Sequence, residues 1–386
     1  MVLSRNDSKY RQCSRSVMDN IADPDINFDE NGVSNYCHEY EALVRRELPT
    51  GAERERRLDQ LISDIKNEGK GKKYDCITGV SGGVDSSYLI YKAKEWGLRP
   101  LIVHFDNGWN SEIAVHNINR IIQATGFDLY TIVVNWEEFR DLQLAYLKAG
   151  VVDLEVPTDH AIYATWYKLA EKYNVNIILD GNNIVTEAIL PRSWIFNKAD
   201  HVNLLAIHKK FGTIPLKTYP IFGFKAKNIQ TFFKCVKSFK PLDLVNYNKQ
   251  VAKKTMQREF GWTDYGGKHY ESVYTKFYQA YILPNKYKID KRKAHLSNLI
   301  LSGQITRAEA LEELARPLYQ PGEAEKEKIY VLKKLGLSND EFEYLMQMPP
   351  VPHEVYGTQK FLTEQYPFLK ILKPVARVLA GFRARL

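Results

Sequence analysis

A short segment rich in serine and glycine limits the fold of this chain more than any other part. Residues 81–87 read Ser-Gly-Gly-Val-Asp-Ser-Ser, after the apolar run 74–80 and before the helical stretch 88–95. Two adjacent glycines let the backbone approach an anion closely, and the first N–H groups of a helix point toward such an anion. An ordinary strand-to-helix turn is the alternative. The combination predicts a phosphate-binding loop, although it lacks the Gly-Lys-Ser/Thr ending of the Walker loop.

The 386 residues allow two domains, or one large domain with appendages. A hydrophobic content of 44% and a charged content of 26% are typical of a soluble globular protein. No apolar run has the length of a membrane span, and the first residues lack a signal-peptide core, so we expect a cytoplasmic protein. The net charge of +8 suits an anionic substrate, a nucleic acid or an acidic membrane surface.

Strand and helix patterns alternate in the central part of the chain. A preceding helix is expected over 53–68. We predict strands at 76–80, 101–105, 129–134 and 176–179, and helices at 86–96, 113–125, 136–149 and 160–173. This alternation predicts an α/β fold with a doubly wound parallel sheet, in which ligands bind at the carboxyl ends of the strands.

Polar residues beside a turn glycine follow three of these strands. They predict a nucleotide site made by Ser81, Gly82, Gly83, Val84, Asp85, Ser86, Ser87, Asp106, Gly181 and Asn182. Asp85 is unsuited to bind phosphate directly, but a Mg²⁺ ion that bridges the phosphates of ATP would explain it. As an alternative, each of these polar residues could do no more than cap its own turn. Their expected position on the same edge of the sheet favours a binding site.

The loop resembles that of the PP-loop ATP pyrophosphatases, which split ATP between its α and β phosphates. The remaining motifs are similar to those of N-acetyl sugar amidotransferases of lipopolysaccharide O-antigen and nonulosonate biosynthesis. The similarity covers residues from about 11 to about 350. Its motifs are Val17 to Gly32, Phe105 to Trp109, Pro157 to His160, Gly181 to Asn183 with Glu187, Phe260 to Ser272, and Asp290 to Ser297.

This resemblance implies an ATP-dependent amidotransferase that converts the acetamido group of a nucleotide-linked sugar into an acetamidino group. The amide oxygen would be adenylylated, ammonia would add to the resulting imidate, and AMP would leave. Such chemistry needs proximity and electrostatic stabilisation and no covalent nucleophile of the protein. The implied ligands are ATP and Mg²⁺.

The ammonia source is expected outside this chain. Residue 2 is valine where some amidotransferases have a nucleophilic cysteine, and Cys76 and Cys235 lie in no recognisable glutaminase context. The resemblance implies a separate glutaminase with a cyclase-like partner, similar to the two halves of imidazole glycerol phosphate synthase.

The N-terminal segment departs from the family pattern. The family usually has two Cys-x-x-Cys pairs that bind structural zinc, whereas this chain has Ser16 and Ser34 beside Cys13 and Cys37. Serine is a poor zinc ligand, so we expect no zinc.

Residues 258–295 combine cations with aromatic side chains, which suits the phosphates and base of a sugar nucleotide. A nucleic-acid surface has the same composition, and a solvated helix surface is the plainer alternative. We predict substrate binding by Asp159, His160, Asn183, Glu187, Lys268, Lys291, Arg292 and His295. Predicted catalytic residues are Ser81, Asp85, His269 and Glu271, with the last two orienting the acetamido group or moving a proton, although a lone histidine is more often structural.

We predict four regions: an N-terminal cap at 1–50, the ATP pyrophosphatase domain at 51–225, a helical substrate-binding domain at 226–350 and a tail at 351–386. Apolar residues at helical spacing from 368 to 386, with cations between them, predict a basic amphipathic helix. It would dock on protein or, alternatively, make a peripheral membrane contact. A tRNA-modifying PP-loop enzyme and an ATP-binding scaffold for a glutaminase are the alternative functions.

Overall fold

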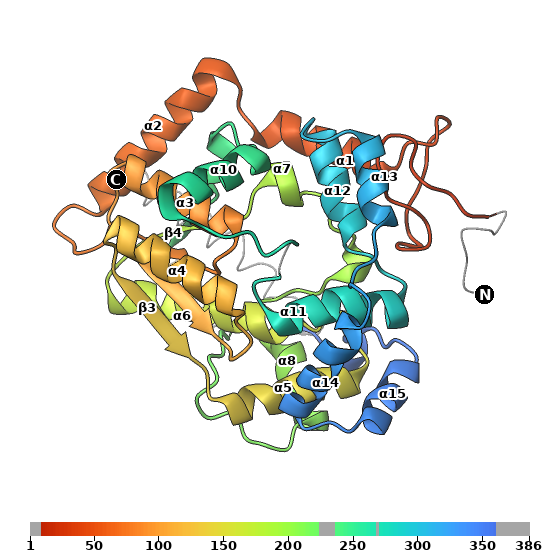
Figure 1. Cartoon of the computed structure of the whole chain (residues 1–386). Helices are drawn as coiled ribbons and strands as arrows, with labels where there is room; N and C mark the ends of the chain where they lie inside the picture. Colours follow the sequence, from red (N-terminus) through yellow and green to blue (C-terminus); the bar gives the residue numbers. More distant parts are fainter. Residues whose placement is uncertain (1–8, 224–235, 268–269, 360–386) are drawn as a thin grey trace, which may run out of the picture.

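The computed structural model describes residues 9–223, 236–267 and 270–359 (Figure 1). Its β-strands are β1 (Cys76–Gly79), β2 (Pro100–Asp106), β3 (Leu129–Val133), β4 (Ile177–Leu179) and β5 (Lys237–Phe239). The helices described between residues 9 and 223 are α1 (Asn35–Glu47), α2 (Gly51–Glu68), α3 (Val84–Glu95), α4 (Glu112–Thr125), α5 (Trp136–Ala149), α6 (Val156–Lys172), α7 (Ile184–Glu187), η1 (Arg192–Trp194) and α8 (His201–Phe211). The later helices are η3 (Pro241–Leu244), α10 (Lys249–Phe260), α11 (Val273–Phe277), η4 (Tyr278–Tyr287), α12 (Arg292–Leu301), α13 (Arg307–Ala315), α14 (Glu323–Leu335), α15 (Asn339–Gln347) and η5 (His353–Tyr356).

The strands form one parallel sheet in the order β3-β2-β1-β4-β5. This confirms the α/β fold predicted from the sequence and adds β5, which the sequence pattern did not indicate. The order reverses between β1 and β4, and ligands of such sheets bind at this switch point, beyond the carboxyl ends of the strands.

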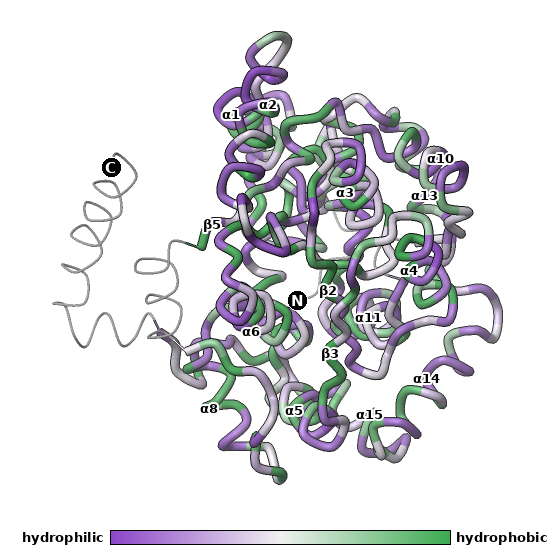
Figure 2. The backbone as a smooth tube through the Cα atoms, turned by 90° about the vertical axis from the view of Figure 1, so that its left-hand side faces the viewer, coloured by the Kyte–Doolittle hydropathy of each residue, from purple (hydrophilic) through white to green (hydrophobic). Residues whose placement is uncertain are grey.

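Both faces of the sheet are covered, as a doubly wound fold requires. Cys76 of β1 faces a core built with α2, α3, α4 and α10, whereas its neighbour Ile77 faces a core built with α6. Successive side chains of a strand point to opposite faces, so β1, β2, β3 and β4 each contribute to both cores. In Figure 2, β2 and β3 are hydrophobic over much of their length, while the surrounding helices alternate in character.

A second body of helices packs beyond the end of the sheet. Its core joins α5 and α8 to α11, η4, α14 and α15, with Phe139, Trp194, Phe277 and Phe342 among the buried side chains. This core combines residues of the two regions that the sequence divides at 225, so the predicted domains 51–225 and 226–350 share one hydrophobic core.

The N-terminal segment packs on α12 and α13 (Figure 1). The buried Lys293 ammonium forms an ion pair with the buried carboxylate of Asp19, and Arg307 donates to the carbonyls of Ser16 and Cys13. The cap therefore supports the C-terminal helices. No helix in the described part of the chain is long and apolar enough to cross a membrane. The predicted helix at 368–386 lies outside the described residues.

Candidate functional site

The loop between β1 and α3 has the backbone that a phosphate site needs. Gly82 has φ +82°, and a Cβ there would lie 2.7 Å from the carbonyl oxygen of Ala114 on α4. Only glycine accepts both the positive φ and this close approach. Gly83 is the N-cap residue of α3, so the first N–H groups of that helix, from Val84 onward, begin directly beyond it.

The serines of the loop divide into two kinds. Ser81 and Ser86 place their Oγ atoms 3.3 Å apart, and the amide of Gly83 donates to Ser81 Oγ at 3.2 Å. Ser87 is fully buried and donates to the carbonyl of Gly83 at 2.6 Å. Ser86 Oγ also donates to this carbonyl, at 3.2 Å, but Ser81 and Ser86 are only half-buried and fit the role of phosphate donors. The fully buried Ser87 stabilises the loop instead of taking the role predicted from the sequence.

Residues of the motif Phe260 to Ser272, together with Asn117, hold the loop in place, a role that the sequence did not predict. The carbonyl of Gly82 accepts a hydrogen bond from Trp262 Nε1 at 2.8 Å and from Asn117 Nδ2 at 3.3 Å. Asn117 also pairs with the backbone of Thr263 in both directions, at 2.8 and 2.9 Å. Segment 261–263 therefore fixes the position of the loop, although it lies far away in the sequence.

Carboxylates gather beside the start of α3. Asp85 accepts a hydrogen bond from the hydroxyl of Tyr247, and Glu187 acts electrostatically on the same hydroxyl. Burial raises the pKa of Asp243 to about 6, and the nearby Asp180 and Glu187 add to this effect. Gly181 lies against α3, because a Cβ there would be 3.4 Å from Ser86 Cα.

Asp85 fits one carboxylate ligand of a Mg²⁺ ion carried by ATP phosphates, because such ions commonly take only one or two carboxylates. The described residues contain no group of three or more ligands that could hold a metal alone.

The end of β2 brings a distant segment to the loop. Asp106 Oδ1 accepts from the amide of Gly108 at 2.9 Å and from Asn110 Nδ2 at 3.0 Å, so it stabilises its own turn. Asn110 then bridges Ser272, and the amide of Ser111 donates to the carbonyl of Glu271 at 2.8 Å.

Glu271 consequently lies at the phosphate loop. A Cβ on Gly83 would lie 3.9 Å from Glu271 Oε1 and 2.9 Å from the hydroxyl of Tyr265. Burial raises the pKa of Tyr265, and Glu271 and Asp85 act on it in the same direction. The structure thus brings predicted Glu271 and Asp85 together. The other catalytic candidate of this motif, His269, lies outside the described residues, as does Lys268.

The predicted substrate residues separate into two groups. His160 is fully buried, with Nδ1 at 2.8 Å from the carbonyl of Lys198 and Nε2 accepting from the amide of Phe222 at 3.0 Å. Asn183 is buried and caps α7, and Arg292 donates to Asp290 and to the carbonyls of Glu313 and Arg316. These contacts give His160, Asn183 and Arg292 structural roles, and substrate binding by them stays a prediction. His295 is half-buried on α12.

Asp159 and Lys291, in contrast, belong to a group of charges around the buried carboxylates of Asp153 and Glu155. We define the acid–lysine cluster as Asp153, Glu155, Asp159, Lys198 and Lys291. Lys198 Nζ lies 2.7 Å from Asp153 and 3.1 Å from Asp159. Burial raises the pKa of Glu155 to about 7, with Asp159 adding to the effect, and burial lowers the pKa of Lys291. The sequence indicated two of these five residues.

The two N-terminal cysteines meet inside the cap. Cys13 Sγ and Cys37 Sγ are 3.6 Å apart and buried, and the amides of Ser16 and Ser34 donate to Cys13 Sγ at 3.3 and 3.2 Å. The contact with Cys37 lowers the pKa of Cys13 to about 4. Four ligand positions converge here, but two of them hold serine, so the residues do not fit a tetrahedral zinc site.

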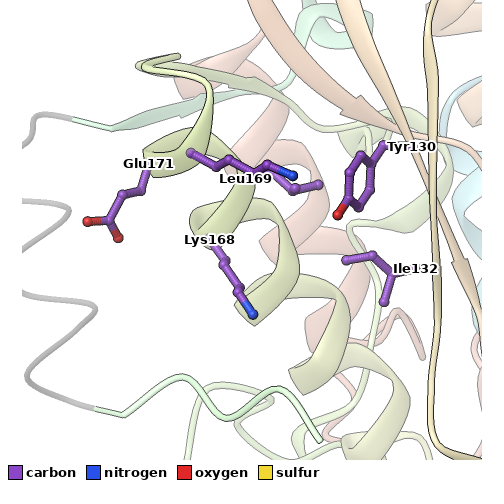
Figure 3. A pocket seen from close by; sticks show the side chains of 6 residues that line it. Tyr130, Ile132, Lys168, Leu169 and Glu171 are labelled. Carbon is purple, nitrogen blue, oxygen red and sulfur yellow. The ribbon is translucent and has the colours of Figure 1, made fainter. Parts of the chain in front are cut away.

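A cavity of about 490 Å³ lies elsewhere, between β3 and α6 (Figure 3). Tyr130 and Ile132 line one side, and Lys168, Leu169 and Glu171 line the other. It includes none of the predicted site residues.

One family model matches part of the chain. Residues 271–373 match the model described as "LPS biosynthesis protein WbpG-like, C-terminal domain". This confirms the resemblance to lipopolysaccharide-biosynthesis proteins over that segment. No curated protein sequence matches the chain.

Solved structures that are similar to this chain include an NMN synthetase from Francisella tularensis, at 14% identity and a TM-score of 0.31, covering 74% of this chain and 97% of that one. An NH3-dependent NAD synthetase from Campylobacter jejuni has 13% identity and a TM-score of 0.29, with coverage of 53% and 94%. A predicted tRNA methyltransferase subunit from Methanocaldococcus jannaschii has 13% identity and a TM-score of 0.27, with coverage of 47% and 75%. Similarities of this size carry no argument about this chain.

Proposed function

Because residues 271–373 match the WbpG-like family of lipopolysaccharide-biosynthesis proteins, we propose that this chain is an ATP-dependent amidotransferase acting on a nucleotide-linked sugar. Its reaction converts an acetamido group into an acetamidino group through an adenylylated imidate, with ammonia from a partner glutaminase. AMP and pyrophosphate are the other products.

One observation carries this proposal: the family-matched segment begins at the phosphate loop. Backbone pairing of residues 109–111 with 271–273 holds Glu271 beside Gly83. A nucleotide seated at the loop and a sugar bound by the C-terminal part would therefore meet at this point. Proximity of the two reactants is the main requirement of adenylyl transfer.

The loop residues have clear parts in such a reaction. The N–H groups at the start of α3 and the hydroxyls of Ser81 and Ser86 would bind phosphate oxygens. Asp85 would hold Mg²⁺, which neutralises phosphate charge when bound. Tyr265 and Glu271 lie over Gly83, where they would orient the acetamido oxygen toward the α-phosphorus.

Replacing Asp85 tests the proposal. The Asp85→Asn variant should lose about 100-fold or more in kcat/KM for AMP release, because a charge-neutralising group at the phosphates is removed. The assay contains ATP, Mg²⁺, an ammonium salt and a uridine diphosphate sugar with an acetamido group.

Asp64→Asn, an exposed carboxylate on α2, serves as the control and should keep full activity. Unchanged AMP release by folded Asp85→Asn protein would contradict the proposal. AMP release that requires tRNA would favour a tRNA-modifying enzyme instead, and absence of AMP with every acceptor would favour a scaffold.

A further inference from the structure

The acid–lysine cluster contains polar atoms that lack partners. Glu155 is 9% exposed; its Oε2 accepts from Thr275 Oγ1 at 3.2 Å, while its Oε1 has no hydrogen-bond partner within the described part of the chain. Tyr274 is 1% exposed, and its hydroxyl also has none among those residues. Glu155 acts electrostatically on that hydroxyl, so the two groups are close. Buried polar groups are nearly always hydrogen-bonded, so this pair indicates a missing ligand or water.

The cluster lies next to the phosphate loop. Helix α11 connects them: Glu271, just before the helix, lies at Gly83, and Thr275 contacts Glu155. Only Ser272 and the first two residues of α11 lie between Glu271 and Thr275. Tyr163 of α6 gives a second link, because Asp180 at the loop and Asp159 in the cluster both raise its pKa, after burial.

The charges of the cluster favour a small cation. Three carboxylates, Asp153, Glu155 and Asp159, face two ammonium groups, Lys198 and Lys291, which leaves one negative charge when all are ionised. The ring of Tyr278 lies 5.9 Å from Lys291 Nζ, and Tyr274 is close enough to Glu155 for the carboxylate to act on its hydroxyl. Carboxylates with aromatic faces are the partners that a desolvated ammonium ion prefers.

We propose that the acid–lysine cluster binds the ammonium ion and that Glu155 accepts its proton, releasing ammonia beside the phosphate loop. This inference rests on the proposed function and names the site of its second substrate. An N–H bond of ammonium breaks and an O–H bond forms on Glu155. The freed lone pair forms the C–N bond with the imidate carbon, and the C–O bond to AMP breaks with its electrons on AMP.

The proton then leaves through Asp159. This residue follows Glu155 by one helical turn, and its side chain is 39% exposed. Burial raises the pKa of Glu155 to about 7, which suits a group that must gain and lose a proton near neutral pH.

Two variants test the site with ammonium chloride as the nitrogen source. In Glu155→Gln, kcat/KM for ammonium should fall about 100-fold at pH 7. The loss should shrink as the pH rises to 9.5, because free ammonia then needs no base. In Tyr274→Phe, KM for ammonium should rise with little change in KM for ATP, and folding should be retained because no described hydrogen bond of the hydroxyl is lost.

Glu327→Gln is the matched control. Glu327 lies on α14 and accepts hydrogen bonds from Lys276 and Tyr319, which are not members of the acid–lysine cluster. Its replacement should therefore leave KM for ammonium unchanged. A second readout is independent of turnover: ammonium chloride, compared with sodium chloride at equal concentration, should raise the melting temperature of wild type and not of Glu155→Gln.

The outcomes separate the two proposals. If wild type forms no AMP with acetamido-sugar nucleotides, the proposed function fails. If wild type is active while folded Glu155→Gln and Tyr274→Phe keep normal ammonium kinetics at every pH, only the ammonium site fails. A salt-specific shift in melting temperature that survives in Glu155→Gln would likewise overturn the site.

Discussion

At the scale of residues, two neighbouring glycines of the loop have different physical requirements. Gly82→Ala should destabilise the protein by about 2 kcal/mol or more, because φ +82° is strained for alanine and the Cβ would press on the backbone of Ala114. Gly83→Ala keeps an allowed φ of −74° and meets only side-chain atoms, so its unfolding free energy should fall less than that of Gly82→Ala. The methyl group of Gly83→Ala would lie over the loop at 2.9 Å from the Tyr265 hydroxyl and should instead raise KM for ATP. Urea unfolding and ATP kinetics of the two variants check this contrast; equal unfolding losses would contradict it.

Glu155 makes stability depend on pH in a defined direction. Its folded pKa of about 7 lies above its ordinary value of 4.5, so the stability provided by the protonated form is complete below about pH 4.5 and is lost as the pH rises to 7. Glutamine resembles the protonated form at every pH. Glu155→Gln should therefore gain stability over wild type between pH 5 and pH 8, on the order of 1–3 kcal/mol. A difference that does not change between these two pH values would show that the carboxyl titrates normally.

At the scale of elements, Asn117 joins α4, the phosphate loop and segment 261–263. Asn117→Ala should lower the unfolding free energy by about 2–3 kcal/mol, because it leaves buried backbone groups of Gly82 and Thr263 with fewer partners. Faster amide hydrogen exchange in segment 261–265 should accompany the loss. Asn67→Ala, on the exposed side of α2, is the control; similar exchange in both variants would contradict the role of Asn117.

The elements themselves could largely be predicted from the sequence. The expected strand at 76–80 is β1 at Cys76–Gly79, and the helix expected at 136–149 is α5 over the same residues. These elements carry local periodicity. β5 has three residues, two of them exposed, so it carries no pattern that distinguishes it from a loop.

The site could be predicted only where one segment supplies it. Ser81, Gly82 and Asp85 follow each other in the chain, so their chemistry is visible in the sequence. The acid–lysine cluster forms only in the folded chain, because Glu155 contacts Thr275 and Lys198 contacts Asp153, which are far apart in the sequence. For His160, the motif alone does not distinguish a substrate-binding histidine from a buried one that is hydrogen-bonded to the backbone, as the structure shows it.

At the scale of the whole molecule, the N-terminal cap brings together the four positions of a metal site, of which two hold cysteine and two hold serine. Ser16→Cys with Ser34→Cys would complete four thiols around one point with Cys13 and Cys37. The double variant should bind about one Zn²⁺ per chain and melt at a higher temperature, because zinc that binds only the folded state stabilises it. Metal analysis and thermal unfolding with and without chelator check this. Wild type with stoichiometric zinc, or a double variant without it, would contradict this description of the cap.

The central claim is that the nucleotide at the loop activates an acetamido oxygen. The most direct measurement uses a sugar nucleotide whose acetamido carbonyl carries ¹⁸O, incubated with ATP, Mg²⁺ and an ammonium salt. Mass spectrometry should find the ¹⁸O in AMP and none in pyrophosphate, with an acetamidino product that has lost the label. AMP without the label, or a product that retains it, would contradict the account.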